Sequence, residues 1–105
     1  MAANLTVAAN KRVRGEILAL LYSVQPVPVE IRTITNSLLE SNMVSVPSIA
    51  QHIDYLSGKK YIQVIGEEAA EQILHGVAPP SAFVKLTPTG VDLVEGTIED
   101  QGVDV

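Results

Sequence analysis

Hydrophobic residues recur at helical spacing in two stretches of the first forty residues. After Asn10, which can cap a helix, apolar side chains fall three or four positions apart, at Val13, Ile17, Leu20 and Leu21. Pro26 and Pro28 stop this pattern. A second stretch starts at Pro28 or Val29 and places Ile31, Ile34 and Leu38 on one face before it ends near Glu40. The pattern predicts two helices joined by a proline-containing turn.

A third helix is predicted after the break at Ser41 and Asn42. Ser45 offers a hydroxyl cap, Pro47 falls in the first turn, and Gly58 ends the pattern. One side of this helix carries an apolar stripe at Val46, Ile49, Ile53 and Leu56.

The second half of the chain predicts a hairpin and a short last helix. Residues 61–65 and 82–86 are rich in β-branched and aromatic side chains and predict two paired strands. Residues 66–81 between them have a helix-favouring centre, so we expect a long hairpin insertion with one or two helical turns. Thr87 and Pro88 open a last helix that ends at Gly96. Residues 97–105 are expected to form a loose acidic tail.

The predicted order is therefore three helices, a hairpin and a helix. This order predicts the α+β fold class and the outline of a winged helix-turn-helix: a three-helix core, a β-hairpin wing with a long insertion, and a short C-terminal helix. We expect one domain over residues 1–96, followed by the tail.

Composition and charge narrow the function classes. The chain has 105 residues, 47% of them hydrophobic, and no cysteine, which excludes disulfides and thiolate chemistry and suits a cytoplasmic protein. No apolar run is long enough to span a membrane, and no signal sequence is visible. The net charge is −5. Five acidic residues and no basic residue follow position 91, so residues 1–91 are neutral overall. A nucleic-acid surface is permitted but not required.

The third helix carries the candidate interface with DNA. If its apolar stripe is buried, its outward face presents hydrogen-bonding side chains that can read base edges: Ser48, Gln51, His52 and Tyr55, with Ser45 at its start. Basic side chains nearby could contact phosphates: Lys59, Lys60, Lys85, Lys11, Arg12 and Arg14.

Two segments carry a resemblance to a known family. Residues 46–62, VPSIAQHIDYLSGKKYI, resemble the recognition helix and following strand of winged-helix DNA-binding domains, and residues 86–94, LTPTGVDLV, resemble their closing strand and last helix. The closing sequence with Gly102 and Val103 is also similar to small winged-helix proteins of Mu-like prophages. The resemblance implies DNA binding in a bacterial cytoplasm, in a phage context. This chain departs from the family at Lys60, where glycine is usual, and in an acidic wing with Glu67, Glu68 and Glu71.

Enzyme chemistry is not expected. Two histidines are too few for a histidine-built metal site, and His52 and Asp54 do not share a helix face. Ser57 and Lys60 have the spacing of a four-residue hydrolase motif but lack its companion motifs. Gly58-Lys59 lacks the preceding glycine and following hydroxyl of a phosphate loop. We therefore expect no catalytic residues, no metal and no cofactor.

Two functions remain. The first is a sequence-specific DNA-binding protein, a small transcriptional regulator that acts as a homodimer on double-stranded DNA. The alternative is a winged-helix module that binds a protein partner and not DNA, which the acidic tail, neutral body and acidic wing favour. A continuous basic band along the third helix would favour DNA, and an apolar patch at the wing would favour a protein.

Overall fold

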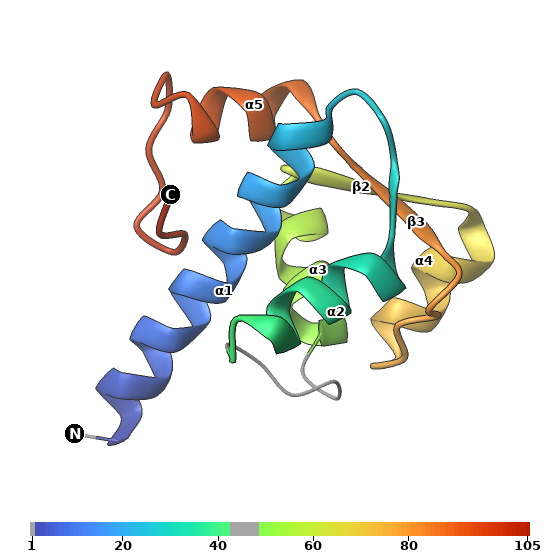
Figure 1. Cartoon of the computed structure of the whole chain (residues 1–105), viewed down its shortest axis with the longest axis horizontal. Coiled ribbons are helices and arrows are strands. Elements are labelled where there is room, and N and C mark those ends of the chain that lie inside the picture. The colour runs from blue at the N-terminus through green and yellow to red at the C-terminus, as the bar shows by residue number, and fades with distance from the viewer. Residues whose placement is uncertain (1, 43–48) are drawn as a thin grey trace.

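The computed structural model describes residues 2–42 and 49–105, with side chains from residue 7 onward in the first range. Figure 1 shows a long first helix lying diagonally across the molecule, with the sheet and most of the remaining helices on one side of it and the C-terminal segment on the other. The elements in chain order are α1 (Ala2–Val24), β1 (Val29–Glu30), α2 (Ile31–Glu40), α3 (Ile49–Gly58), β2 (Ile62–Ile65), α4 (Glu67–Leu74), β3 (Phe83–Leu86) and α5 (Pro88–Val94).

The α+β class is confirmed, with five helices and one three-stranded antiparallel sheet in the described ranges. The strand order is β1-β3-β2, so the last strand lies between the other two. Ile62 pairs with Leu86 and Ile65 with Phe83, while Val29 pairs with Val84. This arrangement is compatible with a winged helix. The two-residue β1 was not predicted, because its residues were assigned to the start of the second helix.

The apolar stripes of the three predicted helices meet in one core. Ile17, Ile34 and Ile53, one from each helix, are fully buried. Val84 of the sheet and Leu93 of α5 complete the same cluster. Burial of such side chains is the main favourable contribution to folding, so the predicted stripes explain how the three helices pack.

The predicted hairpin insertion is helical. Gly66 has a φ of 99°, which suits glycine at the turn from β2 into α4. Helix α4 packs against α3 and β2 and buries Ile73. The predicted last helix is also confirmed: the hydroxyl of Thr87 accepts a hydrogen bond of 3.1 Å from the backbone NH of Gly90 and so caps α5.

The start of the first helix differs from the prediction. Asn10 lies inside α1 and does not cap it, because the helix already begins at Ala2. Residues 2–9 contain four alanines and neither glycine nor proline, so nothing in this segment stops a helix at Asn10. None of the described helices combines the length and the apolar character needed to cross a membrane.

The C-terminal tail also differs from the prediction, because it is packed and not loose. Figure 1 shows the chain after α5 turning back to run beside α1. Val103 is 5% exposed, and the backbone NH of Asp104 donates a 3.1 Å hydrogen bond to the carbonyl of Lys11. The tail comes this close because Gly15 of α1 has no side chain where the carbonyl of Asp104 lies. The tail is therefore part of the folded unit.

Candidate nucleic-acid interface

Helix α3 presents a narrow exposed strip. Gln51 and Asp54 are exposed, while Ala50, Ile53 and Leu56 are buried. The predicted outward position of Gln51 is confirmed. Ser45 and Ser48, the other candidate residues at the start of this helix, lie outside the described residues.

His52 lies in the interior, which corrects the prediction that it faces outward. Its side chain is 4% exposed, and its Nδ1 has no hydrogen-bond partner among the described residues. Burial lowers the pKa of His52, and the positive charge of Arg14 lowers it further. A histidine buried in this way cannot contact a base edge, so His52 serves the packing of α3.

Lowering the pH should destabilise the protein through His52. The pKa of His52 is lower in the folded protein than in the unfolded chain, so the unfolded chain binds a proton more readily. The folded state therefore keeps its full stability at a pH above the ordinary histidine pKa and loses stability as the pH falls below that value. We expect the melting temperature to fall between pH 7.5 and pH 5.5. His52→Leu should remove most of that pH dependence, whereas His75→Leu, at an exposed position, should retain it.

Arg14 and Tyr55 are held between α1, α3 and the tail. The guanidinium carbon of Arg14 lies 3.6 Å from the centre of the Tyr55 ring, and its Nη1 donates a 3.0 Å hydrogen bond to the carbonyl of Gly102. Both side chains are half-buried. Tyr55, predicted to point outward, is half-buried, because the tail lies over the side of the helices that carries it and Arg14. That these two side chains contact DNA stays a prediction.

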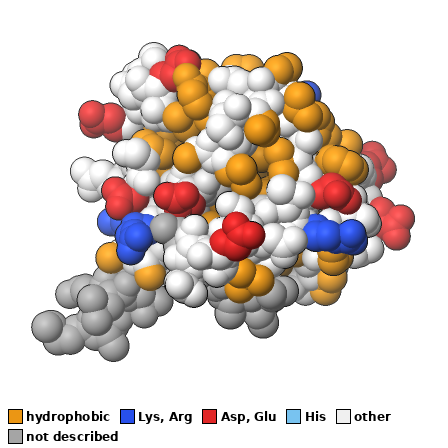
Figure 2. Space-filling model, in the orientation of Figure 1, with side chains coloured by type: hydrophobic (Ala, Val, Ile, Leu, Met, Phe, Trp, Pro, Cys, Tyr) orange, Lys and Arg blue, Asp and Glu red, His pale blue; other side chains and the backbone are white. Residues whose placement is uncertain are grey.

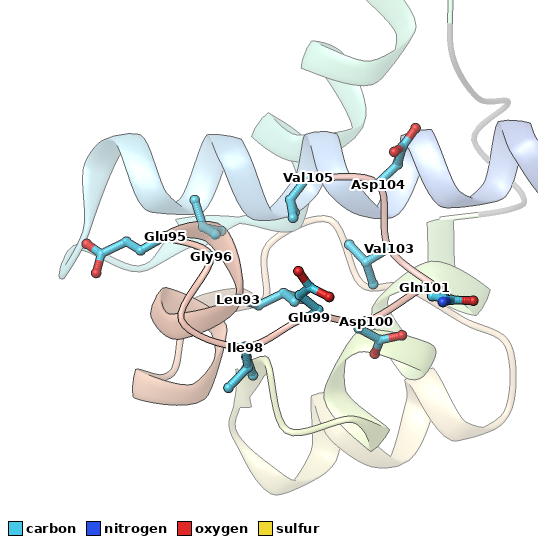
Figure 3. A pocket seen from close by; sticks show the side chains of 11 residues that line it. Leu93, Glu95, Gly96, Ile98, Glu99, Asp100, Gln101, Val103, Asp104 and Val105 are labelled. Carbon is cyan, nitrogen blue, oxygen red and sulfur yellow. The ribbon is translucent and has the colours of Figure 1, made fainter.

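Lys59 is paired with the tail through Asp100. Its Nζ lies 3.3 Å from Asp100 Oδ2, and that carboxylate also accepts hydrogen bonds from the hydroxyl of Tyr61 at 2.6 Å and from the backbone NH of Gly102 at 2.7 Å. These bonds, that of Tyr61 foremost, lower the pKa of Asp100. Burial, followed by the Asp100 carboxylate, raises the pKa of Tyr61 to about 12. Figure 3 shows this acidic segment, with Val103 to Val105 lying along α1.

The remaining basic candidates are exposed or half-buried. Arg12 is exposed and lines a hollow of about 150 Å³ with Ser41 and Asn42, at the end of α2. Lys60 is exposed and has a φ of 69°, so it adopts the left-handed conformation that glycine adopts more readily than other residues. Lys85 is half-buried on the outer face of the sheet, opposite Gln63.

Sequence reasoning gave no role to Arg32, which the structure places beside α3. Arg32 and Asn36 of α2 line a pocket of about 260 Å³ together with Ile49, the first described residue of α3. The two side chains are four residues apart and so lie on one face of α2. That spacing was the signal that could have identified them.

Carboxylates border α3. Helix α4 packs against α3 and exposes Glu67, Glu68 and Glu71, and the tail brings Asp100 to Lys59. The exposed strip of α3 therefore lies near both acidic and basic side chains, and two of the basic candidates, Arg14 and Lys59, are already engaged by the tail. No group of three histidine, aspartate or glutamate side chains in the described ranges is placed to share a metal ion.

Comparisons with family models, with curated proteins and with solved structures found no match to this chain.

Proposed function

We propose that the chain is a winged-helix domain that binds double-stranded DNA with the exposed strip of α3, and that it acts as a small transcriptional regulator. The observation that carries the proposal is the exposure of Gln51 on the second helix of the α2 and α3 pair, with Arg32 beside the start of α3 and Lys60 beyond its end. Glutamine can pair bidentately with adenine in the major groove. The basic side chains of Arg32 and Lys60 can contact DNA phosphates on either side of that contact.

The element order and the sheet order support the fold part of this proposal. Two adjacent helices are followed by an antiparallel pair of strands, and a short strand before α2 completes the sheet. By analogy with regulators built on helix-turn-helix pairs, we propose binding as a homodimer to two half-sites. The resemblance of residues 46–62 and 86–94 to winged-helix domains points the same way.

The engaged tail limits the strength of the proposed binding. The logarithm of the DNA-binding constant falls linearly with the logarithm of the salt concentration, and each phosphate contact makes this slope steeper by about 0.9. Because the tail holds Arg14 and Lys59, few basic side chains near α3 remain available to phosphates. We therefore expect weak DNA binding with a shallow salt dependence.

The proposal is tested by selection from a pool of randomised duplexes of about two helical turns, titrated from low to physiological salt and sequenced. We expect enrichment of a motif with an adenine that Gln51 reads. Gln51→Ala should weaken binding to that motif by about 1–3 kcal/mol. Lys60→Gln should weaken binding to all duplexes and reduce the salt slope by about one.

The control is Gln63→Ala, which makes the same truncation as Gln51→Ala at an exposed glutamine on the outer face of the sheet. It should leave both motif affinity and salt slope nearly unchanged. Absence of retention at low salt would overturn the proposal, and so would an equal loss of affinity in all three variants with unchanged melting temperatures.

A second candidate function is the recognition of a protein partner. It is favoured by the apolar pair Ile65 and Phe83, which is exposed at the end of the sheet beside an acidic helix.

A further inference from the structure

Two large apolar side chains are exposed on the outer face of the sheet. Ile65 of β2 and Phe83 of β3 are directly opposite each other, and they are 41% and 43% exposed. Since side chains alternate along a strand, the neighbouring Val84 points to the opposite face and is fully buried. The pair Ile65 and Phe83 thus presents apolar surface to solvent at the end of the hairpin where α4 is inserted.

A groove joins this pair to α4. It has a volume of about 370 Å³, and we name it the α4–β3 groove; its main lining residues are Ile65, Glu68, Ala69, Gln72, Pro79 and Phe83. One wall comes from α4 and the other from β3 and the segment before it. The small side chain of Ala69 leaves room between them, while Gln72 offers a hydrogen-bonding group to an incoming chain.

The charged side chain that lines the groove is a carboxylate, and further carboxylates lie near it, while Lys85 lies two residues along β3 from Phe83 on the same outer face. Glu68 lines the groove, Glu67 and Glu71 are exposed on the same helix, and Glu30 of β1 lies opposite Phe83. Figure 2 shows hydrophobic side chains gathered toward the upper right, with red carboxylates along the right-hand margin, where α4 lies in Figure 1, and a blue Lys or Arg group beside them. Within the described ranges, no lysine or arginine lines the groove.

From this combination we propose that the α4–β3 groove binds a basic protein segment, one that places an aromatic or aliphatic side chain between Phe83 and α4 with lysine or arginine beside it. An apolar centre with a polar rim is the usual composition of a protein interface, and complementary charge selects the partner. The four glutamates repel phosphates and acidic segments, so nucleic acid is not the occupant. None of Gln51, Arg32 and Lys60 lines the groove, so the proposal does not depend on the proposed DNA binding.

The experiment selects twelve-residue peptides from a random phage-displayed library on the full-length protein. The enriched peptides are then synthesised with a fluorophore and titrated by anisotropy. We expect peptides with a net positive charge and at least one aromatic or aliphatic anchor. Phe83→Thr should weaken their binding about tenfold, as for an anchor contact, and Glu68→Gln should weaken it severalfold and less so at high salt.

Matched controls separate the groove from general surface effects. Val27→Thr removes another exposed apolar side chain, and Glu16→Gln removes another exposed carboxylate, both outside the groove. Neither should change peptide affinity. Ala69→Gln, which fills the groove on a helix that tolerates glutamine, provides a second variant if Phe83→Thr lowers the melting temperature.

Three outcomes would overturn the proposal: no peptide enriched on the wild-type protein, enriched peptides that are acidic, or peptides that bind Phe83→Thr and Ala69→Gln as tightly as the wild type. The DNA selection is repeated with Phe83→Thr. If Phe83→Thr loses peptide binding and keeps DNA binding, the groove is a site distinct from the DNA interface. If the wild-type protein binds the peptides but no DNA, the proposed DNA binding fails and the proposed peptide groove is unaffected.

Discussion

Ile53→Ala is expected to lower the free energy of unfolding by about 2–5 kcal/mol, which is the usual cost of truncating a buried isoleucine. Ile53 is fully buried on α3 and belongs to the cluster that joins α1, α2 and the sheet. The truncation removes apolar contacts and leaves a cavity that a close-packed interior refills only in part. Urea unfolding followed by circular dichroism measures the loss.

The control for Ile53→Ala is the same chemical change at an exposed position. Ile65→Ala removes the same atoms from a side chain that is 41% exposed and should cost less than about 1 kcal/mol. Equal losses in the two variants would contradict the assigned core. Because a typical domain has only about 5–15 kcal/mol of stability, a binding defect in Ile53→Ala would report unfolding and not a contact.

The helical core was predictable because its signal is local. The apolar spacing in each of the three helices is visible within a dozen residues, and the structure buries most of these positions, Ile17, Ile34 and Ile53 among them. Leu20 is half-buried, and Val46 lies outside the described residues. Strand β1 was not predictable in this way. It has two residues, and it exists because Val29 pairs with Val84 and Glu30 with Phe83, far along the chain.

The candidate site was predicted less well than the core, for one physical reason. Helix periodicity predicts the outward face of α3 from the packing of the three helices alone. The tail adds a further layer on the side that carries Tyr55, where Arg14 bonds to Gly102, 88 residues away in sequence. Periodicity indicates which face of a helix is apolar and therefore buried. It gives no information about a segment distant in sequence that covers the opposite, polar face.

Acidic composition was a further reason that the tail was expected to be loose. Its charges suggested solvation, yet Asp100 meets Lys59 and the hydroxyl of Tyr61, and Val103 supplies an apolar anchor. A glycine in the middle of an apolar helix was the available signal. Gly15 costs helix stability relative to alanine, so its presence suggests a close approach by another backbone.

Gly15→Ala is expected to displace the tail and to lower the free energy of unfolding by about 1–3 kcal/mol, the range for overpacking. A β-carbon at this position would overlap the carbonyl group of Asp104, which is backbone and cannot rotate away. The gain in helix propensity, about 1 kcal/mol at most, offsets only part of this cost. A protease specific for glutamate, acting after Glu99, should release residues 100–105 faster than from the wild type, as followed by mass spectrometry.

Gly58→Ala is the matched control, since a β-carbon there has nothing within 4 Å. It should leave both the cleavage rate and the stability close to those of the wild type. Cleavage of Gly15→Ala at the wild-type rate would contradict the docked tail.

If the tail is displaced, Arg14 and Lys59 lose Gly102 and Asp100 as partners and become available to phosphates. Under the proposed function, Gly15→Ala should then bind duplex DNA more tightly than the wild type at low salt, with a steeper salt dependence. Tail release without any change in DNA affinity would indicate that these two bases serve the fold and do not contact DNA.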